Sequence, residues 1–162
     1  MASWGDNALL HDGVAFEAEL RGRLSSWGWD VSAFGSGLLD DPVRTALKVF
    51  RDDYGRPSGL RWLPDLVASR DGRVVLVDAK AERVNTDNYA IPQRALEVGR
   101  VLVDRLHTPL FYVWPDGGVL TPDTVTVSWH TRHSGAGTAG SGNPFVLVDK
   151  RWAAKAHQVF GR

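Results

Sequence analysis

The stretch WLPDLVASRDGRVVLVDAKAE, residues 62–82, places charged residues at the ends of two apolar segments that otherwise read as buried strands. Asp65 stands before the first apolar run, and Asp78 and Lys80 close the second. Asp71-Gly72 between the runs is a strong hairpin-turn signal, so we expect the two strands to pair antiparallel. Buried ions are costly unless they are paired, hydrogen-bonded or bound to a metal. These three charges therefore need partners.

The strand periodicity predicts which of these charges meet. Alternate residues of a strand share one face, so Asp78 and Lys80 project together. Antiparallel pairing can bring Asp65 close to both. Two carboxylates beside one ammonium form either an inert ion-pair cluster or a site for Mg²⁺, which takes oxygen ligands and keeps several waters. On the residues alone, both interpretations remain open.

The composition narrows the class of protein. The chain of 162 residues has no net charge and no cysteine, and its length suits one domain, 1–162. The absence of cysteine excludes disulfides and thiolate chemistry, and it fits a cytoplasmic protein. We find no apolar run long enough to span a membrane and no secretory leader. From Leu120 onward the sequence contains five Lys and Arg residues but only two Asp residues and no Glu, so the C-terminal third is net basic.

Helical and strand periodicities alternate along the chain, which indicates an α/β protein whose sheet is covered by helices on its faces. Pro92 marks the start of one of these helices and the Asp41-Pro42 step that of another. The expected elements are helices at 12–27, 42–54, 92–106 and 150–160, strands at 29–34, 109–114 and 144–148, the hairpin within 62–82, and an extended segment at 119–129.

With these elements in place, the chain resembles a known superfamily. Pro64-Asp65, a short hairpin and Asp-Ala-Lys at 78–80 are similar to the signature of the PD-(D/E)xK nucleases in its D-x-K form. The stretch GVAFEAELRGRLSSWGWDV, 13–31, resembles the opening helix and first strand of that superfamily, where a glutamate on the helix reaches the metal site. Glu17 is the best match for this glutamate, and Glu19 is the second choice.

The resemblance implies a fold. It predicts a restriction-endonuclease-like core in αβββαβ order over about 12–114, with a central mixed sheet flanked by helices. The helix at 42–54 is additional to that core, and 115–162 form a C-terminal extension of the same nuclease domain.

The resemblance also implies a chemistry: a metal-dependent endonuclease that hydrolyses DNA phosphodiester bonds. Such an enzyme could be encoded by a phage or a mobile element. Asp65, Asp78 and the backbone carbonyl of Ala79 would hold Mg²⁺ or Mn²⁺, with Glu17 ligating directly or through water. Lys80 would orient the attacking water or neutralise developing charge.

Further residues are candidates for auxiliary roles. Gln93 lies at the start of the helix after the third strand, where the superfamily often carries an additional catalytic residue, and Tyr89 is the other polar choice there. Trp62 adjoins the site and is the tryptophan to test for base stacking, although tryptophan is more often a core residue. The basic residues proposed to contact DNA are Arg132, Lys150 and Arg151.

Other functions stay open. The chain could be a DNA-binding or interaction protein that keeps the nuclease fold without catalysis, and among enzymes it could be a Holliday-junction resolvase, which would act as a homodimer, or an exonuclease. The Gly-rich stretch 134–142 lacks a P-loop signature. It could approach a phosphate backbone or simply connect two elements. His130 and His133 lack a typical zinc-site context.

Overall fold

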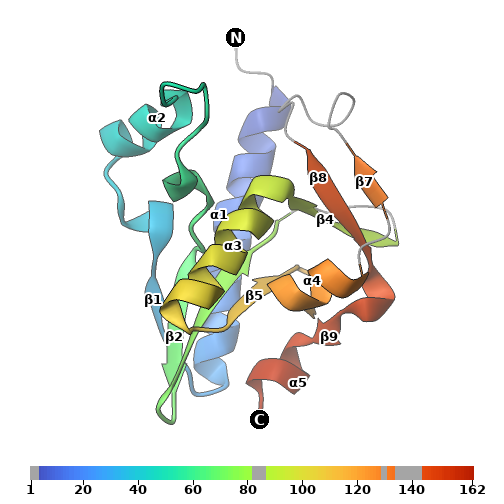
Figure 1. Cartoon of the computed structure of the whole chain (residues 1–162). Helices are drawn as coiled ribbons and strands as arrows, with labels where there is room; N and C mark the ends of the chain where they lie inside the picture. The colour runs from blue at the N-terminus through green and yellow to red at the C-terminus, as the bar shows by residue number, and fades with distance from the viewer. Residues whose placement is uncertain (1–3, 82–86, 129–130, 134–143) are drawn as a thin grey trace.

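This computed structural model describes residues 4–81, 87–128, 131–133 and 144–162 (Figure 1). The Gly-rich stretch 134–142 therefore lies outside the described residues. The elements, in chain order, are α1 (Trp4–Ser26), β1 (Asp30–Ala33), η1 (Gly35–Leu38), α2 (Asp41–Val49), η2 (Gly59–Trp62), β2 (Leu66–Arg70), β3 (Arg73–Ala79), β4 (Asn88–Pro92), α3 (Gln93–Leu106), β5 (Leu110–Val113), β6 (Gly118–Leu120), α4 (Pro122–Ser128), β7 (Thr131–His133), β8 (Phe145–Asp149), η3 (Lys150–Trp152), β9 (Ala154–Lys155) and α5 (Ala156–Phe160).

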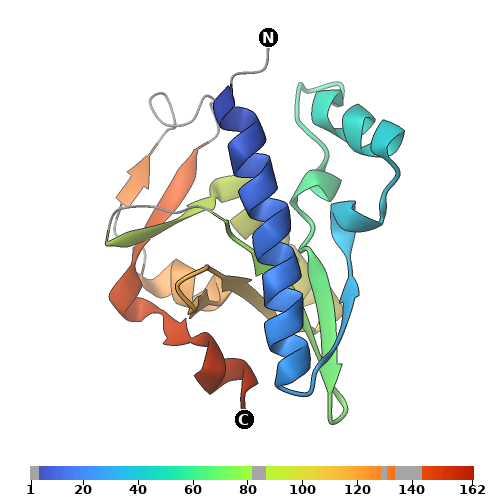
Figure 2. The ribbon, with the colours of Figure 1, turned by 180° about the vertical axis from the view of Figure 1, so that it is seen from behind.

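The strands form a large mixed sheet and a small antiparallel one. The large sheet has the order β1-β2-β3-β5-β6-β9, in which β3 and β5 run parallel and the other neighbouring pairs antiparallel. The small sheet has the order β4-β8-β7. Helices lie on both sides of the large sheet, with α1 on the side that Figure 2 shows in front and α3 on the other. The predicted mixed sheet flanked by helices is confirmed.

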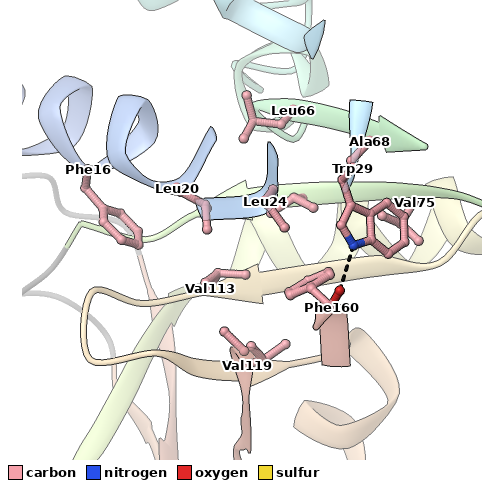
Figure 3. Packing of buried hydrophobic residues seen from close by; sticks show 12 residues of the cluster. Phe16, Leu20, Leu24, Trp29, Leu66, Ala68, Val75, Val113, Val119 and Phe160 are labelled. Atoms are coloured by element: carbon pink, nitrogen blue, oxygen red, sulfur yellow. Dashed lines mark hydrogen bonds between the residues drawn. The ribbon is translucent and has the colours of Figure 1, made fainter. Parts of the chain in front are cut away.

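The core on the α1 side follows from the helical spacing of its apolar residues. Phe16, Leu20 and Leu24 recur every four residues, and all three are buried against the sheet (Figure 3). Beyond the end of α1, the indole Nε1–H of Trp29 donates a 2.8 Å hydrogen bond to the backbone carbonyl of Phe160. This bond ties the C-terminal helix α5 to the same core.

The core on the opposite side joins the two sheets. It comprises residues of β3, β4, β5, β8, α3 and α4, with Tyr112 and Trp114 among its largest fully buried side chains. The hydroxyl of Tyr112 donates to the carbonyl of Ala95 on α3, at 3.2 Å. Gly99 of α3 lies so close to that hydroxyl that an added Cβ would overlap it. Helix α3 therefore packs tightly over β5, and this contact holds the second layer in place.

Three predicted helices differ in length from those observed. The first begins at Trp4, not near residue 12. The second, predicted at 42–54, ends at Val49, because the chain then enters a loop closed around the carboxylate of Asp52. The last, predicted at 150–160, is helical only at its two ends. Between them Lys155 pairs with Gly118 of β6, and this sheet contact interrupts the helix.

One segment was predicted wrongly, and one strand was not predicted. The stretch 119–129, predicted to be extended, contains helix α4, whose first turn is capped by Thr121 Oγ1 accepting from the Thr124 N–H at 3.1 Å. Thr121-Pro122-Asp123 is a helix-start sequence that outweighs the β-branched residues after it. The stretch Asn88–Pro92 forms strand β4 because β8, distant in sequence, pairs with it.

Candidate active site

The hairpin register brings the two aspartates of the signature side by side. Leu66 of β2 pairs with Val77 of β3, so one step further along the same register Asp65 faces Asp78. Facing residues of an antiparallel pair have Cβ atoms about 4.5–5.5 Å apart. The parallel pairing of β3 with β5 sets Tyr112 beside Asp78. The antiparallel hairpin that the sequence predicts is thus confirmed, and it places both carboxylates at one end of the sheet.

Hydrogen bonds hold the charged groups in position. Asp65 Oδ2 accepts from the backbone N–H of Ala79 at 2.8 Å. The Nζ of Lys80 donates to Asp78 Oδ2 at 2.8 Å, in an ion pair whose side chains are only 15% and 9% exposed. The backbone N–H of Lys80 donates to the carbonyl of Val113, which continues the β3–β5 contact past the end of β3. The three charges therefore sit on rigid strand ends.

This group of charged residues has more carboxylates than ammonium groups. Burial, and next the charge of Asp78, raise the pKa of Asp65 to about 7, against a partial offset from the Ala79 N–H and the ammonium of Lys80. Glu17 adds to the rise, so this residue of α1 lies within electrostatic range of Asp65. One ammonium does not neutralise this set of carboxylates. The site therefore favours an additional positive charge.

The donor set fits a divalent cation that keeps most of its water. Among the described residues, no group of three or more His, Asp or Glu side chains is close enough to hold a metal as it stands. Asp65 and Asp78, at the same end of the hairpin, supply two carboxylates. Mg²⁺ is commonly held by one or two carboxylates plus waters, and it would relieve the repulsion that raises the Asp65 pKa. Glu17 is close enough to affect the pKa of Asp65, but it does not form a close group of three with the two aspartates among the described residues.

Two further predicted residues have contacts of their own. Gln93 opens α3 and donates from Nε2 to Glu97 Oε1 at 3.0 Å on the exposed side of the helix. Trp62 ends η2, three residues before Asp65, and packs against the core beneath α3. Its indole nitrogen is buried and has no hydrogen-bond partner in the part of the chain that the structure describes. No hydrogen bond or ion pair within the described residues joins either side chain to the two aspartates.

The predicted DNA-contacting residues cluster around the small sheet. Lys150 Nζ lies 3.6 Å from Asp116 Oδ2, and Arg151 pairs with Asp149 at 2.9 Å while remaining largely exposed. Arg132 lies on β7, where its backbone pairs with β8. Arg132 thus lies on β7, and Lys150 and Arg151 directly follow β8.

Tyr112 is a neighbour of the site that the sequence did not single out. The Nζ of Lys80 lies 5.5 Å from the centroid of its ring, within the range of a cation–π contact. Burial, and then the charge of Asp78, raise the pKa of the Tyr112 hydroxyl above its usual value. Nothing in the sequence pointed to this neighbour, because Tyr112 lies within the apolar run 109–114. Only the register of β5 against β3 shows which side chain of that run lies beside Asp78.

The fold and this site define a class. The chain has the restriction-endonuclease-like fold, in which a mixed sheet flanked by helices carries an Asp and an Asp-x-Lys on adjacent strands. Among solved structures it is similar to Archaeoglobus fulgidus Hjc, a Holliday junction resolvase from an archaeal hyperthermophile. The match has a TM-score of 0.55 at 12% identity and covers 92% of this chain and 100% of that one. The fold is the one that the resemblance seen in the sequence implied.

The sequence comparisons add no closer relation. No protein-family model matches the chain, and no curated protein matches it significantly. The likeness to Hjc therefore establishes the fold. Within the described residues, none of the helices has the length and apolarity that crossing a membrane requires.

Proposed function

We propose that this protein is a metal-dependent DNA endonuclease. The observation that carries the proposal is that Asp65 and Asp78 lie at the same end of the β2–β3 hairpin, close enough for Asp78 to raise the Asp65 pKa, with Lys80 paired to Asp78. Their uncompensated charge is expensive to bury and has no use in a purely structural cluster, where one carboxylate per ammonium would suffice. A cation and a phosphodiester would use all three groups.

Each residue has a distinct task in this proposal. Asp65 and Asp78, with the Ala79 carbonyl, would hold Mg²⁺ or Mn²⁺, and Glu17 would contact it through water. A cation bound there supplies positive charge to the phosphate and lowers the pKa of a coordinated water. Lys80 would then release part of its contact with Asp78 and orient the attacking water. Its ammonium would also stabilise charge that develops on the phosphate.

The tight packing around the site explains why these positions suit catalysis. Asp65 is fixed by the Ala79 N–H, and Lys80 is fixed at its backbone by Val113 and at its ammonium by Asp78. Groups held on strand ends lose little freedom when the substrate binds. Gln93 is placed less securely, because its side chain is engaged with Glu97. We propose for it a supporting role at most.

Cleavage of defined DNA substrates tests the proposal. Duplex, single-stranded and four-way-junction DNA are incubated with the protein and Mg²⁺, Mn²⁺ or EDTA, and the products are resolved on denaturing gels. The junction belongs in the panel because Hjc, which shares the fold, is a resolvase. Cleavage that requires Mg²⁺ or Mn²⁺ supports the proposal. Absence of metal-dependent cleavage on every substrate would refute it.

Asp78→Asn is the decisive variant in that assay. It should abolish cleavage and leave DNA binding intact or tighter, because it removes a negative charge that would face phosphate. The matched control is Asp71→Asn at the hairpin tip, whose carboxylate is exposed and which keeps the positive φ that asparagine tolerates. A fully active Asp78→Asn variant would exclude this residue as a metal ligand.

A DNA-binding protein that keeps the fold without catalysis is the second candidate. The observation in its favour is that Glu17 does not join the two aspartates in a close group of three among the described residues. The same cleavage panel separates the two functions, since such a protein would bind DNA and cut none of it. If the junction is cut, sedimentation of the protein at the assay concentration tests the proposed homodimer.

A further inference from the structure

Residues 50–62, FRDDYGRPSGLRW, combine aromatic and arginine side chains in close alternation. We refer to them as the aromatic–arginine segment. Phe50 is 48% exposed and Tyr54 82% exposed, although aromatic rings of this size are normally buried. They are among several large apolar side chains exposed from η1 to η2, the others being Leu38, Val43, Val49 and Leu60. Within the described residues, neither ring belongs to the two buried cores.

Guanidinium groups lie over two of the rings. The Cζ of Arg56 is 4.9 Å from the centroid of Tyr54, and that of Arg61 is 5.7 Å from the centroid of Trp62. Arg51 caps the end of α2 by donating to the carbonyls of Lys48 and Phe50. Aromatic faces that stack bases, interleaved with cations that meet phosphates, are the two components of sites for single-stranded nucleic acid.

The loop that carries Tyr54 is held in shape before any ligand arrives. Asp52 Oδ1 accepts from the backbone N–H groups of Tyr54 and Arg56, and Asp52 Oδ2 pairs with the Arg56 Nε at 2.7 Å. These contacts, the Arg56 N–H first among them, hold the pKa of Asp52 below its usual value. Gly55 completes the turn with a positive φ of 74°. The exposed ring of Tyr54 is thus presented by an ordered turn, and the carboxylate of Asp52 is engaged by contacts within that turn.

A pocket adjoins this loop. It has a volume of about 330 Å³ and lies between the aromatic–arginine segment and α3, with Phe50 and Trp62 in its wall. Arg56 and Arg94 also line it, and Arg94 is paired with Glu97 at 2.8 Å. Small-molecule pockets begin at about 300 Å³, so this one suits a single planar ring rather than a longer stretch of chain.

The segment leads directly to the candidate active site. Trp62 precedes Asp65 by three residues, and Figure 1 shows α2 and the chain after it beyond the end of the large sheet at which β2 begins. The Asp65–Asp78 pair stands at this same end. DNA held by the segment would therefore continue toward the two aspartates.

We infer that the aromatic–arginine segment binds an unpaired stretch of DNA beside the scissile phosphate, with one base in the pocket between Phe50 and Trp62. This inference rests on the proposed function for the identity of the polymer and specifies its substrate class: DNA that carries unpaired nucleotides next to a duplex. Fully paired DNA presents no base faces to these rings and would be held through its phosphates alone.

Binding in EDTA tests the inference independently of cleavage. Fluorescence anisotropy measures the affinity for a thymidine oligonucleotide, for a duplex of equal length and for that duplex with an unpaired tail. Stacking should quench tryptophan emission with the oligonucleotide and the tailed duplex. Tyr54→Leu removes a ring with no core contact, and it should weaken binding to both by about fivefold or more while leaving binding to the duplex unchanged.

Controls separate stacking from charge and folding. Tyr54→Phe keeps the ring and should bind as the parent does. Val74→Ala removes an exposed apolar side chain near the hairpin tip and Arg105→Ala an exposed cation at the end of α3, and neither should affect the unpaired-strand preference. Equal affinity for paired and unpaired DNA, or an unchanged Tyr54→Leu variant, would overturn the inference. So would a Tyr54→Leu variant that alters self-association and not DNA binding.

The outcomes distinguish this inference from the proposed function. Metal-dependent cleavage without any preference for unpaired DNA would overturn the inference alone. Tight, tyrosine-dependent binding of unpaired DNA without cleavage would support the inference and refute the endonuclease. Two variants of Trp62 add a check on the pocket. Trp62→Phe keeps a ring, so its affinity for unpaired DNA, measured by anisotropy, should stay within about twofold of the parent. Trp62→Leu has no ring, and its affinity should fall by more than that.

Discussion

Replacing Asp65 with asparagine should make the metal-free protein more stable at neutral and higher pH. Asparagine has nearly the same shape, and its Oδ1 can still accept from the Ala79 N–H that now bonds Asp65 at 2.8 Å. The substitution removes a negative charge that burial and Asp78 destabilise. Removing a repelled charge while keeping its hydrogen bond leaves no group unpaired, so the change should stabilise the fold.

The pKa of Asp65 sets the size and sign of this effect. The pKa rises from an ordinary value of 3.8 to about 7 in the folded protein. Each tenfold change in that equilibrium is worth about 1.4 kcal/mol, so ionised Asp65 costs the fold about 4 kcal/mol. Because the folded pKa is the higher one, the cost is absent below the unfolded pKa. It grows as the pH rises from about 4 to about 7 and is constant above that.

Chemical denaturation in EDTA across this pH range measures the effect. The free energy of unfolding of Asp65→Asn should match that of the parent near pH 4 and exceed it by up to about 4 kcal/mol near pH 8. Added Mg²⁺ should stabilise the parent and not the variant, because ligand binding stabilises only a protein that holds the site. Asp71→Asn, at an exposed turn, should show neither change. A variant that is less stable than the parent at pH 8, or equally shifted at all pH values, would refute the electrostatic reasoning.

Three further substitutions have defined outcomes. Lys80→Ala should still fold when Mn²⁺ is present and should lose cleavage by about a hundredfold or more, the scale of one transition-state contact; parental activity, or collapse in thermal melts with Mn²⁺, would exclude the catalytic role. Gly118→Ala should cost about 1–3 kcal/mol in denaturation, because its Cβ would overlap the hydroxyl of Tyr89, and a neutral result would show that the ring can move. Trp29→Phe should cost about 0.5–1.5 kcal/mol, because it removes the indole hydrogen bond while the carbonyl of Phe160 still accepts from Arg70 at 2.9 Å, and near-parental stability would show that the indole bond is dispensable.

The local patterns of the sequence determined the elements of the core. The Asp71-Gly72 turn between two apolar runs was enough to predict the hairpin, and α1 and α3 followed from the spacing of their apolar residues. The pairing of the hairpin then placed Asp65, Asp78 and Lys80 on one face without any further information. These features depend on interactions between residues close in the chain, which is why a sequence read by itself could predict them.

Contacts between distant segments decided the rest. Strand β4 exists because β8 pairs with it from more than fifty residues away. Of the basic residues in the C-terminal third, Arg132 lies on β7 and Lys150 and Arg151 directly follow β8, so the pairing of these two strands brings them to the small sheet. The exposure of Tyr54 is also a tertiary property, since a sequence shows that a ring is present but not whether the fold packs anything against it. Burial, likewise, set the Asp65 pKa, because desolvation depends on what surrounds a carboxylate in space and not on its neighbours along the chain.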